Sequence, residues 1–101
     1  MRYKKDILKQ VKQIKIPEVK DIFACKRFTI SKDLENRITK LVNIIAGKDI
    51  YSLEDGFSGC KYSNSITFYV KQYDIEVIFT KQGTIKDFSI NKTACDIGGL
   101  F

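Results

Sequence analysis

The chain has 101 residues and a mass of 11.6 kDa, with 44% hydrophobic residues, 30% charged residues and a net charge of +6. This length predicts one domain, residues 1–101, around a single hydrophobic core, and the apolar content excludes an intrinsically disordered chain. No apolar run approaches the roughly 18 residues that cross a bilayer, and no secretory signal is recognised, so we expect a soluble cytoplasmic protein without a membrane span.

The first predicted element is a helix at the N-terminus. Apolar residues recur at steps of three and four, which places them on one side of a helix: Tyr3, Ile7, Leu8, Val11 and Ile14. Pro17 cannot donate the backbone hydrogen bond that would continue this helix, so we expect the helix to end near Lys15. Residues 17–30 leave two alternatives open. Pro17–Arg27 suits a short second helix, and Phe28–Ile30 suits a short strand.

A further helix is predicted at residues 32–46. Ser31 is a good N-cap because its hydroxyl can accept an unpaired N–H of the first turn. Gly47 lies where a left-handed C-terminal cap is expected. The apolar residues of this helix share one predicted buried face: Leu34, Ile38, Leu41, Val42 and Ile45.

The second half of the chain predicts loop and strands. Residues 52–65 are rich in Gly, Ser and Asn, which is typical of a loop or an irregular hairpin. Apolar and polar residues then alternate at 66–71 and 75–80, as in strands with one buried face, and Gln82 and Gly83 indicate a tight turn. The sequence therefore predicts an α+β fold, with N-terminal helices packed on one face of a three-stranded, or slightly larger, antiparallel meander at residues 65–91.

The last strand has an irregular apolar pattern. Phe88 and Ile90 share one phase of the alternation and are expected to be buried, whereas Ile85 lies on the other phase. Since successive strand residues point to opposite faces, this change of phase suggests a β-bulge or a short start of the strand.

Residue types needed for most enzyme mechanisms are missing. The chain has no His, which removes the commonest general base and the commonest metal ligand. Cys25, Cys60 and Cys95 include no CxxC pair, so we expect reduced thiols packed in the core instead of nucleophiles or zinc ligands. Glu54 and Asp55 precede a Gly and are interpreted as turn residues. We therefore predict no enzyme activity, no cofactor and no metal.

Positive charge is concentrated at the N-terminus. Residues 1–16 carry six basic side chains and only Asp6 as an acidic one, so this segment holds +5 of the net charge of +6. On a helical wheel, four basic residues fall within a sector of roughly 80° opposite the apolar stripe: Arg2, Lys5, Lys9 and Lys12. Such a ridge is either the solvated face of an amphipathic helix or a contact surface for nucleic-acid phosphates, an acidic protein or anionic lipid.

Two apolar features are further candidate contacts. Tyr69 and Ile78 fall on the nominally exposed face of the sheet, so that face is either partly covered or binds something. Near the C-terminus, two glycines precede Leu100 and Phe101. Their flexibility would let these side chains dock on a partner or fold back onto the core of the chain, and fold-back is the preferred interpretation.

The leading hypothesis is a small non-enzymatic binding protein that occupies the surface of a larger partner, either a protein or a protein–nucleic acid complex. Ile and Lys, which have AT-rich codons, are each used 15 times, which suggests a low-GC bacterium, its phages or its plasmids. A specific form of the hypothesis is therefore a phage or mobile-element inhibitor of a host defence nuclease, similar to an anti-CRISPR protein. The alternative is a nucleic-acid-binding or regulatory protein that uses the basic helix on phosphates. A homodimer and a Cys-dependent enzyme stay open.

Overall fold

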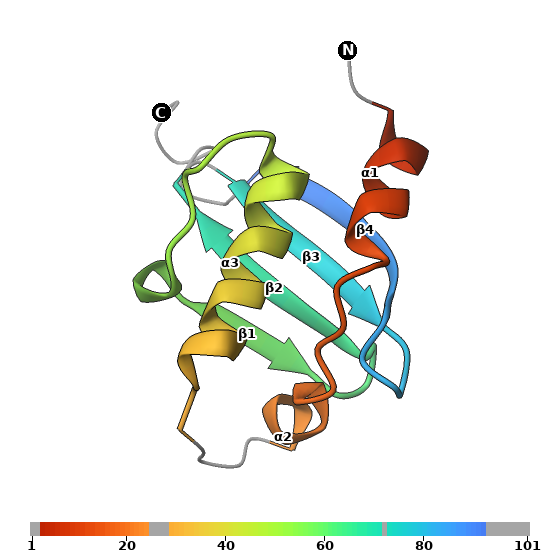
Figure 1. Cartoon of the computed structure of the whole chain (residues 1–101), viewed down its shortest axis with the longest axis vertical. Coiled ribbons are helices and arrows are strands. Elements are labelled where there is room, and N and C mark those ends of the chain that lie inside the picture. The colour runs from red at the N-terminus through yellow and green to blue at the C-terminus, as the bar shows by residue number, and fades with distance from the viewer. Residues whose placement is uncertain (1–2, 25–28, 72, 93–101) are drawn as a thin grey trace.

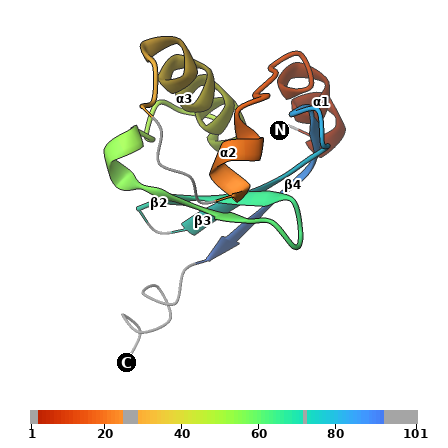
Figure 2. The same cartoon turned by 90° about the horizontal axis from the view of Figure 1, so that it is seen from below.

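Four antiparallel strands form one layer of the structure and three helices form the other (Figure 1). The computed structural model describes residues 3–24, 29–71 and 73–92. The strands follow one another in the sheet in the order β1-β2-β3-β4, and all three helices lie on the same side of it (Figure 2). The predicted α+β class is therefore confirmed. In chain order the elements are α1 (Lys4–Val11), α2 (Val19–Phe23), α3 (Lys32–Ala46), the 3-10 turn η1 (Leu53–Asp55), β1 (Phe57–Cys60), β2 (Ser65–Val70), β3 (Tyr73–Phe79) and β4 (Ile85–Lys92).

Helix α3 matches its prediction at both ends. The Ser31 hydroxyl accepts the Leu34 N–H at 3.1 Å, which satisfies one of the free donors of the first turn. Gly47 ends the helix with a φ of +82°, in the left-handed region. The predicted face of α3 is buried against the sheet, and its side chains join a core that also includes Val11, Ile16, Phe68 and Val77.

Helix α1 ends earlier than the sequence predicts. It stops at Val11, not near Lys15. Ile14 and Ile16 are both buried, and two positions two residues apart point in nearly opposite directions on a helix, so this segment has to be extended. The Ile16 N–H donates to the Gly83 carbonyl at 2.8 Å. The helix therefore ends where the β3–β4 hairpin offers a backbone partner and a buried site for Ile16.

In the ambiguous segment at residues 17–30, the described positions, 17–24 and 29–30, contain one short helix. Helix α2 has five residues and buries Val19 and Ile22. Thr29 and Ile30 are not in a strand, while Phe28 lies outside the described residues, so the strand alternative is wrong for the part that the structure describes.

Strand β1 lies inside the segment for which the sequence left a loop or an irregular hairpin open, and with β2 it forms a hairpin. It pairs with β2 along its whole length and makes the sheet four-stranded. Its Gly content gives it low strand propensity, which is why the alternation pattern does not reveal it. Packing requires the glycine of this strand, because a Cβ on Gly59 would lie 2.9 Å from Cγ2 of Ile22 on α2. The residue that suggested a loop therefore allows a helix to approach an edge strand closely.

Strand β4 contains the predicted bulge, but one of its predicted core residues is exposed. The register shifts between Ile78 and Phe79, so that Ile85 faces the core opposite Phe79. Ile90 was predicted to be buried and is 50% exposed. The start of α1 covers Phe88, over whose ring the Lys4 ammonium lies at 5.3 Å. Strand β4 continues beyond the N-terminal end of α1. Ile90, two residues after Phe88, therefore lies beyond the helical layer.

A salt-bridge cluster holds α3 to the segment between α1 and α2. The Arg37 guanidinium donates two hydrogen bonds to the Glu18 carboxylate, at 2.7 and 3.1 Å, and one to the Lys15 carbonyl at 2.7 Å. It also contacts Asp33 on its own helix at 2.9 Å. This hydrogen bonding by Arg37 holds the pKa of Glu18 below its usual range. A single side chain therefore ties α3 to two points of the segment between α1 and α2.

None of the described helices is long and apolar enough to cross a membrane.

Substituting Gly83 should destabilise the fold more than substituting another glycine of positive φ. Gly83 has a φ of +87°, and a Cβ there would lie 2.3 Å from the Ile16 carbonyl oxygen. Gly47, with a φ of +82°, is exposed and serves as the control. We expect Gly47→Ala to lower the free energy of unfolding by about 1–2 kcal/mol and Gly83→Ala by about 3 kcal/mol or more, because backbone overlap adds to the strain. Equal losses in urea unfolding would contradict this account.

Removing Arg37 should lower stability in a pH-dependent way. Arg37→Met should reduce the free energy of unfolding by about 1–2 kcal/mol at neutral pH, because Glu18 is about one third exposed and solvent screens the pair. A lowered folded pKa contributes stability above the unfolded glutamate pKa of about 4.3 and loses it as the pH falls through the folded pKa. The difference from the native chain should therefore shrink in acid, as urea titrations can measure. Lys40→Met on the exposed side of α3 is the control and should change little.

Candidate functional site

The basic residues predicted on the first helix form an exposed row on α1. Lys5, Lys9 and Lys12 are all exposed, and they follow one another at the three- and four-residue spacing of neighbours on a helix surface. The opposite side of α1 packs into the core through Ile7 and Val11. The fourth predicted member of the row, Arg2, lies outside the described residues.

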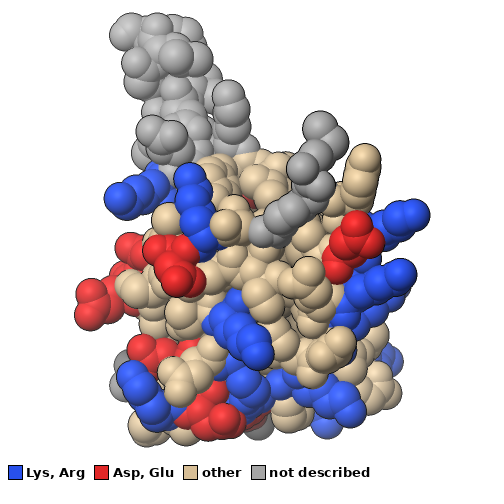
Figure 3. All heavy atoms as spheres, turned by 45° about the horizontal axis from the view of Figure 1, so that its top comes forward, with Lys and Arg blue, Asp and Glu red and all other residues tan. Residues whose placement is uncertain are grey.

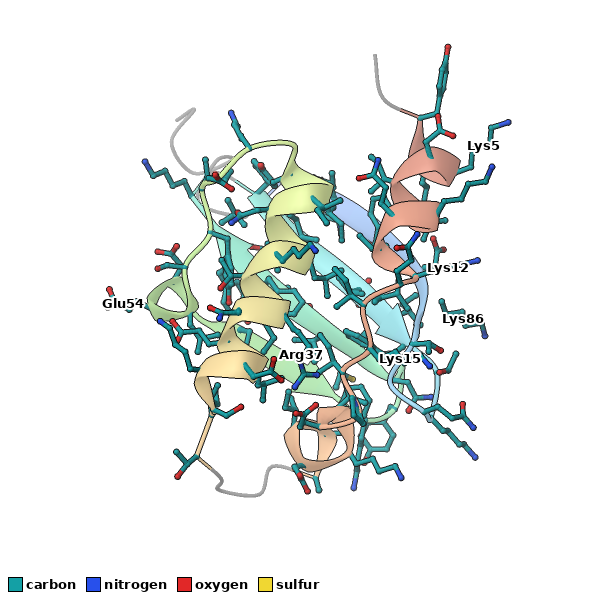
Figure 4. All side chains as sticks on the ribbon, viewed as in Figure 1. Lys5, Lys12, Lys15, Arg37, Glu54 and Lys86 are labelled. Atoms are coloured by element: carbon teal, nitrogen blue, oxygen red, sulfur yellow. The ribbon has the colours of Figure 1, made fainter. Side chains whose placement is uncertain are left out.

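Two lysines from other segments extend this row. Figure 4 shows Lys86, at the start of β4, beside Lys12, with Lys15 next along the same side of the molecule. The arrangement follows from the antiparallel run of α1 and β4, since Lys15 forms a β-bridge with Thr84. All of these side chains are exposed. We refer to the surface formed by Lys5, Lys9, Lys12, Lys15 and Lys86 as the lysine edge.

The lysine edge has little internal charge compensation. The nearest acidic residue of β4, Asp87, is held by Lys4, whose Nζ lies 3.0 Å from Asp87 Oδ1. The hydrogen bond from Lys4 holds the pKa of Asp87 below its usual range, so the carboxylate stays charged and its charge is matched locally. Within the described residues, no lysine of the edge forms a salt bridge. Asp6 is the only acidic residue of α1.

Acidic side chains are unevenly distributed over the surface, whereas basic ones occur on every side in view (Figure 3). In the space-filling view, lysine and arginine side chains dominate the side on which α1 and β4 lie, and most acidic side chains in view are on the other side (Figure 3). Glu54, in the turn η1, projects from that far side (Figure 4). The side with α1 is therefore the side in Figure 3 where positive charge is least offset by acidic residues.

The other predicted contact residues do not join the lysine edge. Tyr69 is 41% exposed, and it follows β2 onto the sheet face that the helices leave uncovered. Ile78 lies on the same face and is half-buried. Leu100 and Phe101 lie outside the described residues. Tyr69 is therefore a separate surface feature.

The described cysteine is not a core residue, which corrects the prediction for it. Cys60 is exposed, because it lies on the uncovered face of the edge strand β1. A hydrogen bond with the Ser63 side chain lowers the pKa of its thiol. The Ser63 hydroxyl in turn lies 2.7 Å from that of Ser65, which donates to Glu76 at 3.2 Å. Cys25 and Cys95 lie outside the described residues.

The acidic pair has the turn role that the sequence indicates. The Asp55 carboxylate accepts the Ser52 N–H at 3.1 Å and closes a capping box around η1. Across the part of the chain that the structure describes, no three Cys, Asp or Glu side chains come close enough together to hold a metal ion.

Sequence reasoning missed two members of the lysine edge. Lys15 was counted in the charged N-terminal segment but was placed at the end of a helix, off the predicted ridge. Lys86 is one of several exposed lysines in the second half, and no periodic pattern connects it to α1. Only the packing of α1 beside β4 brings the two segments together.

The pKa of Cys60 should depend on Ser63. Ser63→Ala removes the hydrogen bond that stabilises the thiolate, so the pKa of Cys60 should rise. The pH midpoint of its alkylation in the folded protein, read by mass spectrometry of the peptide that contains it, should move upward. Ser58→Ala on the same strand is the control, and an equal shift in both variants would count against the assignment.

Comparison with known protein families, with curated proteins and with solved structures gave no significant match, so the lysine edge is interpreted from its own geometry.

Proposed function

We propose that this chain is a small binding protein that acts by occupying the surface of a larger, negatively charged macromolecule. The contact surface is the lysine edge. The observation that carries the proposal is the convergence of unpaired lysines from α1, from the segment after it and from β4, beside an acidic residue that Lys4 already neutralises. Charges presented in this way attract a polyanion over several ångströms and raise its association rate.

The energetics of α1 support a role in binding. Lys5 and Lys9 are four residues apart, and Lys9 and Lys12 are three apart, so like charges are neighbours on one helix face. Such pairs destabilise a helix by about 0.2–0.5 kcal/mol each. The fold would be more stable with acidic residues interspersed, and a partner of opposite charge turns this repulsion into binding energy.

We propose binding in place of catalysis. The chain has no His to act as a general base. The hydrogen bond with Ser63 lowers the pKa of the Cys60 thiol, but the groups that follow it in the hydrogen-bonded chain are the hydroxyls of Ser63 and Ser65, which are weak general bases. The lysine edge offers positive charge and hydrogen-bond donors, which hold a ligand without transforming it.

In its narrower form the proposal makes the protein a cytoplasmic inhibitor of a host defence nuclease, carried by a phage or mobile element as anti-CRISPR proteins are. The Ile- and Lys-rich composition supports that origin. The charge restricts the mode of inhibition, because a basic edge is repelled by the positively charged channel in which a nuclease holds nucleic acid. Such an inhibitor would bind an acidic surface of the nuclease or its bound nucleic acid. The same repulsion disfavours a homodimer paired through this edge.

Charge reversal on the edge should abolish binding of the partner. We would compare the triple variant Lys5→Glu, Lys9→Glu, Lys12→Glu with a control of equal net charge, Lys40→Glu, Lys48→Glu, Lys71→Glu, whose three sites are exposed and lie elsewhere. Each protein is immobilised and used to capture partners from a lysate of the native host, with and without nuclease treatment. The native chain and the control should retain the same partner, and the edge variant should lose it.

The two variants separate a located surface from net charge alone. Each lowers the net charge by six, so a non-specific effect weakens both equally. Retention by the edge variant together with loss by the control would contradict the proposal, as would turnover of a substrate by the purified chain.

A further inference from the structure

A pocket of about 310 Å³ lies at the end of the molecule where α2 meets the sheet. Val19, Lys20 and Phe23 of α2 line one side of it, and Asn64 of the β1–β2 turn and Lys81 of the β3–β4 turn line the other. Its volume falls at the lower end of the range for small-molecule sites, which begins at about 300 Å³. Three segments far apart in the sequence therefore build one small concave site.

We call this site the α2 pocket. Its lining offers three kinds of contact: an apolar wall, a side-chain amide and two positive charges. Val19 is buried and Phe23 is half-buried, so the pocket has an apolar wall with an aromatic ring. Asn64 is fixed by its backbone, because its carbonyl accepts the Phe79 N–H at 2.8 Å. Its side-chain amide makes no hydrogen bond to another described residue. Lys20 and Lys81 are exposed and form no salt bridge with described residues. A ligand that matches all three is flat and apolar, has a hydrogen-bonding edge and carries negative charge.

Aromatic surface continues beyond the α2 pocket. Phe23 also lines a second hollow of about 420 Å³, whose other residues include Lys61 and Tyr62. Tyr62 is 90% exposed, and the Lys61 ammonium lies 5.5 Å from the centre of its ring. Stacking of bases on exposed aromatic rings, with lysines beside them, is the usual way in which proteins hold single strands.

The α2 pocket lies at one end of the lysine edge. Lys81 is two residues before Gly83, which accepts the Ile16 N–H, and Thr84 pairs with Lys15 of the edge. Lysines therefore run from α1 through Lys15 to the β3–β4 turn and the pocket. A polymer with a negative charge on each repeating unit fits this line of lysines better than a single compact anion does.

We propose that the partner is a single-stranded nucleic acid, with a base in the α2 pocket, phosphates on Lys20 and Lys81, and the backbone continuing along the lysine edge. This inference rests on the proposed function and names the class of its partner. A base enters the pocket only when it is unstacked, which selects single strands over duplexes. Protein interfaces are depleted in Lys and enriched in Arg and aromatic residues, so an acidic protein is the weaker match for the edge. The apolar side of α1 is buried in the core, which leaves no face to insert into lipid.

Fluorescence anisotropy with a labelled single-stranded oligonucleotide of about 20 nucleotides tests this inference, with a duplex of the same sequence as the competitor. Two variants address the pocket: Phe23→Leu, which keeps apolar packing but removes the ring, and Lys20→Glu, Lys81→Glu. Lys40→Glu, Lys48→Glu is the control of equal charge. Circular dichroism and urea unfolding check that each variant folds.

The native chain should bind the single strand more tightly than the duplex. Phe23→Leu should weaken binding about fivefold or more, which corresponds to the loss of one stacked base. Lys20→Glu, Lys81→Glu should weaken it at least about tenfold and make the slope of log affinity against log salt shallower by about 1.4, because each lost phosphate contact contributes about 0.7. The control should bind like the native chain.

The remaining outcomes would overturn the inference, and the capture experiment decides whether the proposed function falls with it. Tighter binding to the duplex, or equal affinity of the native chain and both pocket variants, would remove the base-binding role of the pocket. Absence of nucleic-acid binding, together with capture of an acidic protein that the edge variant loses, would refute this inference and keep the proposed function. Absence of both would refute the two together.

Discussion

The structure depends on how the segment after α1 is held. Ile16 is completely buried, its N–H donates to the Gly83 carbonyl, and on its other side Arg37 donates to the Lys15 carbonyl. These contacts fix the exit of α1 between the β3–β4 hairpin and α3. Helix α1 lies along the outer strand from this point, as the Lys4–Asp87 salt bridge and the Lys15–Thr84 bridge show, so its charged side lies near β4 and Lys86 (Figure 4). The same attachment places the β3–β4 turn, and with it the pocket residue Lys81, at the end of the row.

The charge pattern and the packing pattern of α1 have different physical origins. Burial of Ile7 and Val11 stabilises the helix in its place, whereas neighbouring lysines on its outer side repel one another. Only one lysine, Lys4, is used locally, to match Asp87 and to cover Phe88. Residues that are unfavourable for folding and that no local partner compensates are typical of surfaces that meet another molecule. This asymmetry supports placing the function on the side of α1.

The two faces of the sheet also differ in polarity. The inner face is apolar and covered by helices, while the outer face carries the Cys60 hydroxyl chain, Glu76 and the exposed ring of Tyr69. Three acidic residues, Asp74, Glu76 and Asp87, lie on this outer face, so its charge is negative. Electrostatic attraction of a polyanion therefore belongs to the edge and not to the sheet face, and the two surfaces are separated by the thickness of the strand layer.

The sequence by itself determined α3 with both of its caps, the alternating strands, the β4 bulge and the basic row on α1, because each depends on a local pattern of a few residues. Tertiary structure decided what local patterns do not encode. Contact with Gly83 ended α1 early, pairing with β2 decided between the loop and the hairpin left open at residues 52–65, and the end of helical cover exposed Ile90. The candidate site divides in the same way: its helix row could be predicted, while Lys86 and the α2 pocket could not, since they join segments that meet only when the chain has folded.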